Sequence, residues 1–256
     1  MKPTTLVLRA AGTNCDVEAA YAFELAGAKA ISVHINRILE SPAILQDCQI
    51  LAFPGGFSYG DDIAAGKILA NQIVHHLGDA IRSFIEAGKP VIGICNGFQV
   101  LVKTDLLPGP LAGQTGQTAT LTSNDSGRFI DRWVHLSPRN SKCIWTKNLG
   151  PIDLPIAHGE GKFVPASEAV RKALHDQRQI PLVYENGNPN GSVDDIAGVC
   201  DSTGLVFGLM PHPERYVDPQ QHYAWSSAGP LPPEGQGLQI FRNAVAHVAE
   251  AVGAGV

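Results

Sequence analysis

One stretch, residues 89–99, constrains the fold of this chain more than any other, because it specifies a strand, a sharp turn and a helix in succession. It reads Lys-Pro-Val-Ile-Gly-Ile-Cys-Asn-Gly-Phe-Gln. The apolar residues 91–94 predict a buried strand, and residues 98–103 predict a helix. Cys95 lies between them in a Gly-x-Cys-x-Gly turn, whose glycines let strand and helix approach closely. This is the pattern of a nucleophile elbow that carries cysteine in place of serine.

The predicted position of Cys95 favours a reactive thiolate. The turn holds the residue in a strained backbone conformation, so its sulfur projects from the carboxyl edge of a sheet at the start of a helix. The positive end of the helix dipole lowers the free energy of a thiolate there. We therefore expect covalent chemistry through Cys95.

The first hundred residues alternate between strand and helix patterns. Helices are expected over residues 16–26 and 68–87, with a break near Gly78, between short apolar strands at residues 6–8, 31–35, 50–53 and 91–94. Such repeats predict an α/β fold with a mostly parallel central sheet and helices on both faces. Reactive groups in these folds gather beyond the carboxyl ends of the strands, where Cys95 and Pro54-Gly55-Gly56 are expected.

The remainder of the chain predicts further β structure within the same domain. Residues 118–145 indicate an antiparallel excursion, and residues 196–200 and 205–209 indicate a hairpin. A Pro- and Gly-rich loop over residues 218–234 and a helix over residues 238–251 follow. Because no linker-like composition separates these parts, we expect residues 1–256 to form a single domain.

Composition excludes several classes of protein. A net charge of −5 gives no reason to expect nucleic acid or an anionic membrane as a partner. No apolar stretch approaches the roughly 20 residues of a membrane span, and the start of the chain does not resemble a secretory signal. The five cysteines are odd in number and lack a C-x-x-C pair, which argues against a disulfide framework or a zinc site. A cytoplasmic location is expected, and no metal site is.

A cysteine nucleophile needs a base and a group that orients the base. His212 and Glu214 follow an apolar strand, and residues two apart in an extended segment point the same way. We expect His212 to carry the proton and Glu214 to hold its tautomer. Taken alone, His-Pro-Glu favours a turn that ends a strand, so the cysteine elbow decides the interpretation. His158 and Glu160 are the second choice for this role.

Acyl transfer also needs an oxyanion hole. The N–H of Asn96, directly after the nucleophile, is one expected donor, and the N–H of Gly56 is the other. No phosphate-binding loop of the G-x-x-x-x-G-K-[ST] type occurs, so nucleotide chemistry is expected on another chain. Asp61-Asp62 favours a solvated turn over a metal site. Cys15 precedes a helix, which suggests a somewhat acidic thiol, and the safer interpretation is a buried or site-lining residue.

Together these motifs resemble the class I (triad-type) glutamine amidotransferases, and within them the glutaminase subunits of phosphoribosylformylglycinamidine synthase. The elbow and His-Pro-Glu indicate the class. The Gly-Phe-Ser-Tyr-Gly-Asp and Cys-Asn-Gly-Phe-Gln stretches point to this subunit. The resemblance extends over nearly the whole chain, through residues 12–16, 53–61, 93–99, 157–161 and 190–215.

The resemblance implies a flavodoxin-like class I glutaminase architecture and a complete reaction. Cys95 would attack the side-chain amide of L-glutamine to form a thioester, with Gly55, Gln99, Arg128 and Phe129 binding the substrate. Ammonia would pass to a partner synthetase, which uses ATP and Mg to convert formylglycinamide ribonucleotide into the amidine, with a small accessory subunit in the complex. No cofactor is expected on this chain.

Three alternatives remain open at this point. The first alternative is a glutaminase that serves a different synthetase. The second is a non-catalytic regulatory subunit that has kept the fold, and the third is a cysteine peptidase of related architecture. An intact set of Cys95, His212 and Glu214 argues against the regulatory subunit, and peptidase relatives seldom pair the elbow with His-Pro-Glu.

Overall fold

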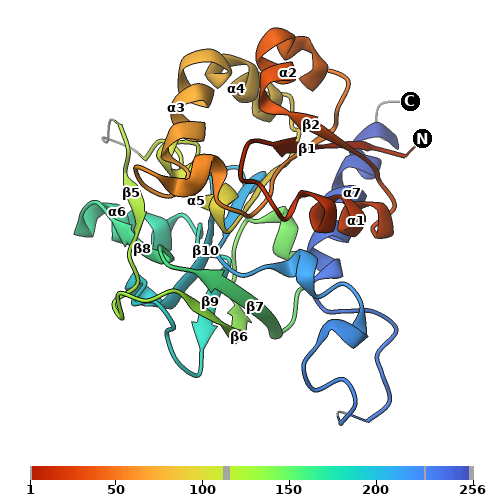
Figure 1. Cartoon of the computed structure of the whole chain (residues 1–256), viewed down its shortest axis with the longest axis vertical. Coiled ribbons are helices and arrows are strands. Elements are labelled where there is room, and N and C mark those ends of the chain that lie inside the picture. Colours follow the sequence, from red (N-terminus) through yellow and green to blue (C-terminus); the bar gives the residue numbers. More distant parts are fainter. Residues whose placement is uncertain (1, 112–115, 228, 254–256) are drawn as a thin grey trace.

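The computed structural model describes residues 2–111, 116–227 and 229–253, and its centre is a nine-stranded sheet (Figure 1). The spatial order of the strands is β2-β1-β3-β4-β11-β10-β9-β6-β7. Their bounds are β1 Thr4–Arg9, β2 Lys29–His34, β3 Ile50–Phe53, β4 Val91–Ile94, β6 Ile130–Pro138, β7 Ile152–His158, β9 Leu182–Glu185, β10 Ile196–Cys200 and β11 Val206–Leu209.

The half of the sheet from β2 to β11 is parallel, as predicted. Every residue of β3, β4 and β11 is buried, because helices cover both faces. The helices α1 and α7 lie side by side (Figure 1), joined by an edge-to-face contact of Phe23 with Phe241 at 4.9 Å, while α3 packs on α5. The helices are α1 Asp16–Leu25, α2 Ile35–Glu40, α3 Lys67–His76, α4 Gly78–Glu86, α5 Asn96–Lys103, α6 Glu168–Asp176 and α7 Leu238–Gly253.

The β-rich middle of the chain extends the central sheet. Strands β10, β9, β6 and β7 pair antiparallel in turn, which confirms the predicted antiparallel excursion and the β10–β11 hairpin. Two further strands, β5 Ala119–Thr122 and β8 Lys162–Pro165, form a separate antiparallel pair. The edge strand β7 lies against the loop that follows β11, where the N–H of His212 donates to the carbonyl of Pro155 at 2.9 Å.

Some local expectations need correction. Ile35, expected at the end of a strand, starts α2, because the His34 ring accepts the N–H of Asn36 and caps a helix there. The short helix α6 and strands β7 to β9 had no clear sequence signal. The expected helix over residues 68–87 does break near Gly78, into α3 and α4. Across the described part of the chain, the helices lack the apolar length needed to span a bilayer.

Candidate active site

Cys95 stands at the bend between β4 and α5 in a conformation that few side chains adopt. Its φ is 51° and its ψ is −105°, and the residue is almost fully buried. The bend is tight because Gly97 presses on β3: a Cβ at this glycine would lie 1.9 Å from the carbonyl oxygen of Phe53. The N–H of Cys95 donates to Leu209 at 2.8 Å, which ties the elbow to β11. The predicted nucleophile elbow is therefore formed, with its strain held by neighbouring strands.

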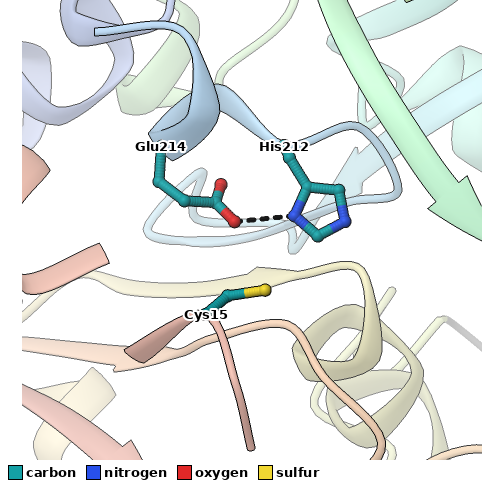
Figure 2. A group of neighbouring side chains, drawn as sticks. All are labelled: Cys15, His212 and Glu214. Carbon is teal, nitrogen blue, oxygen red and sulfur yellow. Dashed lines mark hydrogen bonds and ion pairs between the residues drawn. The ribbon is translucent and has the colours of Figure 1, made fainter. Parts of the chain in front are cut away.

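His212 and Glu214 follow β11, whose last residue is in register with the last residue of β4. Nδ1 of His212 lies 2.6 Å from Oε1 of Glu214, and the side chains are 2% and 0% exposed (Figure 2). Since a carboxylate only accepts, Nδ1 carries the hydrogen and Nε2 is left as the reactive nitrogen. Nε2 has no hydrogen-bond partner among the described residues.

The surroundings of His212 stabilise its protonated form. Burial lowers the pKa of the imidazole, but the Glu214 carboxylate and the Cys95 sulfur both raise it, and the net direction is upward. Cys95 follows β4 and His212 follows the adjacent strand β11, so the two residues emerge at the same edge of the sheet. The Cys95 thiol also contacts the carbonyl of Ala157 on β7 at 3.6 Å. An imidazole whose protonated form is favoured and a buried thiol thus lie at the same sheet edge.

A second thiol, Cys15, lies beside the imidazole (Figure 2). The ligand atoms of Cys15, His212 and Glu214 lie within 4.8 Å of one another, and the Cys15 sulfur accepts from Nη2 of Arg215 at 3.1 Å. Burial raises the pKa of the Cys15 thiol, so the expectation of an acidic thiol is wrong and that of a buried, site-lining residue is confirmed. A metal ion bound by all three would displace the His212–Glu214 hydrogen bond.

A small cavity of about 190 Å³ opens beside Cys95. It is lined by Gly56, Phe57, Asp61, Ala65, Cys95, Gln99, Phe129, Ala157, His158, Gly159 and Glu160. Among the residues expected to bind substrate, Gln99 and Phe129 are in this lining, while Gly55 and Arg128 are outside it. Gly55 packs against the imidazole, where a Cβ would lie 2.8 Å from Cε1 of His212. The side chain of Arg128 is exposed.

The two expected oxyanion donors are both available. Asn96 is the first residue of α5, so its N–H has no acceptor within the helix. Gly56 forms an antiparallel bridge with Thr13 in which the neighbouring residues make the hydrogen bonds. The N–H of Gly56 consequently points away from Thr13.

Sequence reasoning undervalued the acidic part of the cavity. Asp61, interpreted as part of a solvated turn, lines the cavity and accepts the N–H of Gly66 at 3.0 Å, whereas Asp62 is exposed as expected. The Gln99 side chain is occupied by the protein itself, since its Nε2 donates to the carbonyl of Glu160 at 2.6 Å. The Gly-Phe-Ser-Tyr-Gly-Asp stretch, which begins at Gly56 just beyond β3 and ends at Asp61, was the available signal for this residue.

His158, the rival for the base, is held in a different role. Asn124 donates through Nδ2 to the carbonyls of Arg128 and His158, so its Oδ1 accepts from Nδ1 of His158 at 3.1 Å. Burial, reinforced by the proximity of His212, lowers the pKa of His158 to about 4. A neutral, fixed imidazole of this kind is a poor proton carrier beside His212.

Comparison with known proteins identifies the family. The chain matches the CobB/CobQ-like glutamine amidotransferase domain over residues 2–248. It is 49% identical over 253 residues to the phosphoribosylformylglycinamidine synthase subunit PurQ of Dehalococcoides mccartyi, covering 95% of this chain and 97% of that relative. The chain belongs to the PurQ family. The PurQ subunit of Treponema denticola is similarly related, at 48% identity over 241 residues, covering 85% of this chain and 89% of that subunit.

A solved structure supports the same assignment. The structure of PurLQS from Thermotoga maritima contains a chain that is 32% identical, with a TM-score of 0.75 and coverage of 96% of this chain and 99% of that one. The predicted resemblance and the predicted fold class are confirmed. This PurQ family member is a glutamine amidotransferase.

Proposed function

We propose that this chain is the glutaminase subunit of a phosphoribosylformylglycinamidine synthase and that Cys95, His212 and Glu214 perform the hydrolysis. The observation that carries the proposal is the strained Cys95 at the end of β4, facing a buried His212–Glu214 pair at the end of the adjacent β11. Membership of the PurQ family supplies the substrate, L-glutamine.

The first half-reaction forms a thioester. The Cys95 thiolate attacks the amide carbon of glutamine, and the resulting oxyanion accepts hydrogen bonds from the N–H groups of Asn96 and Gly56. The His212 imidazolium gives its Nε2 proton to the leaving nitrogen, which departs as ammonia when the C–N bond breaks. The raised pKa of His212 favours this proton-donating form.

The second half-reaction releases glutamate. Neutral His212 takes a proton from water, the hydroxide attacks the thioester, and the C–S bond breaks to restore the thiolate. Glu214 keeps Nδ1 protonated throughout and stabilises the imidazolium when it forms. Gln99 is assigned to positioning the Glu160 loop, Phe129 to contact with the substrate and Gly55 to packing beneath the imidazole.

The partner assignments rest on the relatives. We propose that ammonia passes to a synthetase subunit that holds ATP and Mg, and that a small accessory subunit completes the complex; the PurLQS assembly of Thermotoga maritima supports this. A cytoplasmic location fits five unpaired cysteines, one of them the nucleophile. The continuous nine-stranded sheet supports treating residues 1–256 as one amidotransferase domain.

The test uses the assembled complex with Cys95→Ala and Cys95→Ser. Both variants are expected to lose glutamine-dependent synthesis and glutamine hydrolysis while retaining synthesis from added ammonia. Persistent hydrolysis of glutamine by the Cys95→Ala complex would contradict the mechanism. Loss of ammonia-dependent synthesis as well would place the defect in assembly, and capture of a synthetase from another pathway would overturn the assignment of the partner.

A further inference from the structure

Two carboxylates line the cavity beside Cys95 and neither takes part in the hydrolysis described above. Asp61 follows the loop after β3, and Glu160 follows β7, so they reach the cavity from separate parts of the chain. Over the described ranges, neither carboxylate has an ion-pair partner within 4.0 Å. The cavity lining contains no lysine or arginine. The Lys103 ammonium is near both carboxylates but lies outside the lining, so the charged groups that face the cavity itself are acidic and suit a cationic ligand group.

Asp61 is held in place by two hydrogen bonds, one of them from Asn96 in the elbow. Its Oδ1 accepts the N–H of Gly66 at 3.0 Å and the side-chain Nδ2 of Asn96 at 3.1 Å. Asn96 directly follows the nucleophile, so the carboxylate is held at a set position relative to Cys95. Burial raises the pKa of Asp61; the hydrogen bonds from Gly66 and Asn96 and the charge of Lys103 oppose this rise, and the Glu160 carboxylate adds to it. A bound cation would relieve both raising effects.

Glu160 is held in place by hydrogen bonds to Gln99 of α5 and to Ala65. Its carbonyl accepts from Gln99, which lies one turn beyond Cys95, and its Oε2 accepts the N–H of Ala65 at 3.4 Å. One turn of helix rises about 5.4 Å. The two methylene groups and the α-carbon of glutamine span a similar length, so a substrate whose amide carbon contacts the Cys95 sulfur extends toward the loop that Gln99 holds.

We propose that Asp61 and Glu160 bind the α-ammonium group of the glutamine substrate and thereby select an amino acid over a simple amide. The inference rests on the proposed glutaminase function and adds the recognition of the end of the substrate that does not react. The ammonium donates to both carboxylates, while the amide carbon lies over Cys95. Charge-assisted hydrogen bonds of this kind are among the strongest available to a small ligand.

The experiment compares two substrates in the assembled complex. L-Glutamine carries the α-ammonium, and 4-carbamoylbutanoate is the same molecule without it. In Asp61→Asn and Glu160→Gln, the kcat/KM for glutamine is expected to fall about 10- to 100-fold, because a charged hydrogen bond is lost. The kcat/KM for 4-carbamoylbutanoate should stay within about twofold of wild type, since that substrate never makes the contact.

The matched control is Asp62→Asn, which removes an exposed neighbouring carboxylate outside the cavity lining and should leave both substrates unaffected. Both amide variants keep an oxygen that can accept the N–H groups of Gly66 and Ala65, which preserves the local fold. Equal losses for the two substrates, or an unchanged preference for glutamine, would overturn the inference. If Cys95→Ala still hydrolyses glutamine, the failure lies instead with the proposed function.

Discussion

The ring of His212 and the carboxylate of Glu214 form a closed pair: Nδ1 lies 2.6 Å from Oε1, and almost none of either side chain is exposed. Water cannot compete for this hydrogen bond, so the tautomer of the imidazole is fixed before substrate arrives. Burial of the Glu214 carboxylate is unfavourable, and its attraction to the protonated imidazole offsets this desolvation. In the proposed mechanism, this pair supplies the proton donor for the reaction at Cys95.

Replacing Glu214 with Gln should disable catalysis with little change in substrate binding. The amide can bond to Nδ1 but does not stabilise the imidazolium, so we expect kcat to fall about 10²- to 10⁴-fold. Because the Glu214 charge raises the pKa of His212, that pKa should also fall in the variant. Steady-state kinetics of the complex and an NMR titration of His212 measure the two effects. An unchanged titration would contradict the role given to the carboxylate.

Replacing Gly55 with Ala should displace the imidazole. The new Cβ would lie 2.8 Å from Cε1 of His212 and 3.1 Å from the Cys15 sulfur, closer than side-chain carbons pack. We expect at least about a tenfold loss of kcat, since small misplacements of a catalytic group carry large rate penalties. Gly150→Ala is the matched control, because nothing lies within 4 Å of its Cβ position. Full activity in Gly55→Ala would show that the ring is free to move.

Gly97→Ala tests the packing that makes the elbow. A methyl group at this position would meet the carbonyl oxygen of Phe53 at 1.9 Å, and both partners are backbone segments of the buried core. We expect a loss of about 3 kcal/mol or more in the free energy of unfolding, or failure to fold. Urea denaturation, again beside Gly150→Ala, provides the measurement. A loss below about 1 kcal/mol would mean that β3 and α5 separate easily.

The burial of His158 should make the free energy of unfolding depend on pH. Its pKa is lowered to about 4 in the folded chain against an ordinary value of 6.5, so the unfolded chain binds the proton more tightly. Stability from this group is present above about pH 6.5 and is lost as the pH falls toward 4. Wild type should lose about 2 kcal/mol more than His158→Gln between pH 7 and pH 5.

Urea denaturation at both pH values measures this difference. His75→Gln, which changes an exposed histidine on α3, is the control. Parallel losses in wild type and His158→Gln would show that His158 does not hold a buried, neutral state.

The alternation of strands and helices, the elbow around Cys95 and the His-Pro-Glu motif could be predicted from sequence because each depends on local patterns. Apolar periodicity specifies β4 and β11, and glycines at fixed spacing specify the bend. These features act over a few residues, so the chain alone determines that a buried thiol at the end of one strand and an imidazole at the end of another belong to one sheet edge.

The tertiary structure alone decided which other groups complete the site. Cys15 contacts the imidazole from the loop after β1, and a hydrogen bond from Asn96 holds Asp61 at the cavity. Glu160 and His158 arrive because the antiparallel strands bring the end of β7 back to the nucleophile. Such contacts depend on the order of the strands and on the twist of the sheet. Packing between distant segments determines both, so they leave no local pattern in the sequence.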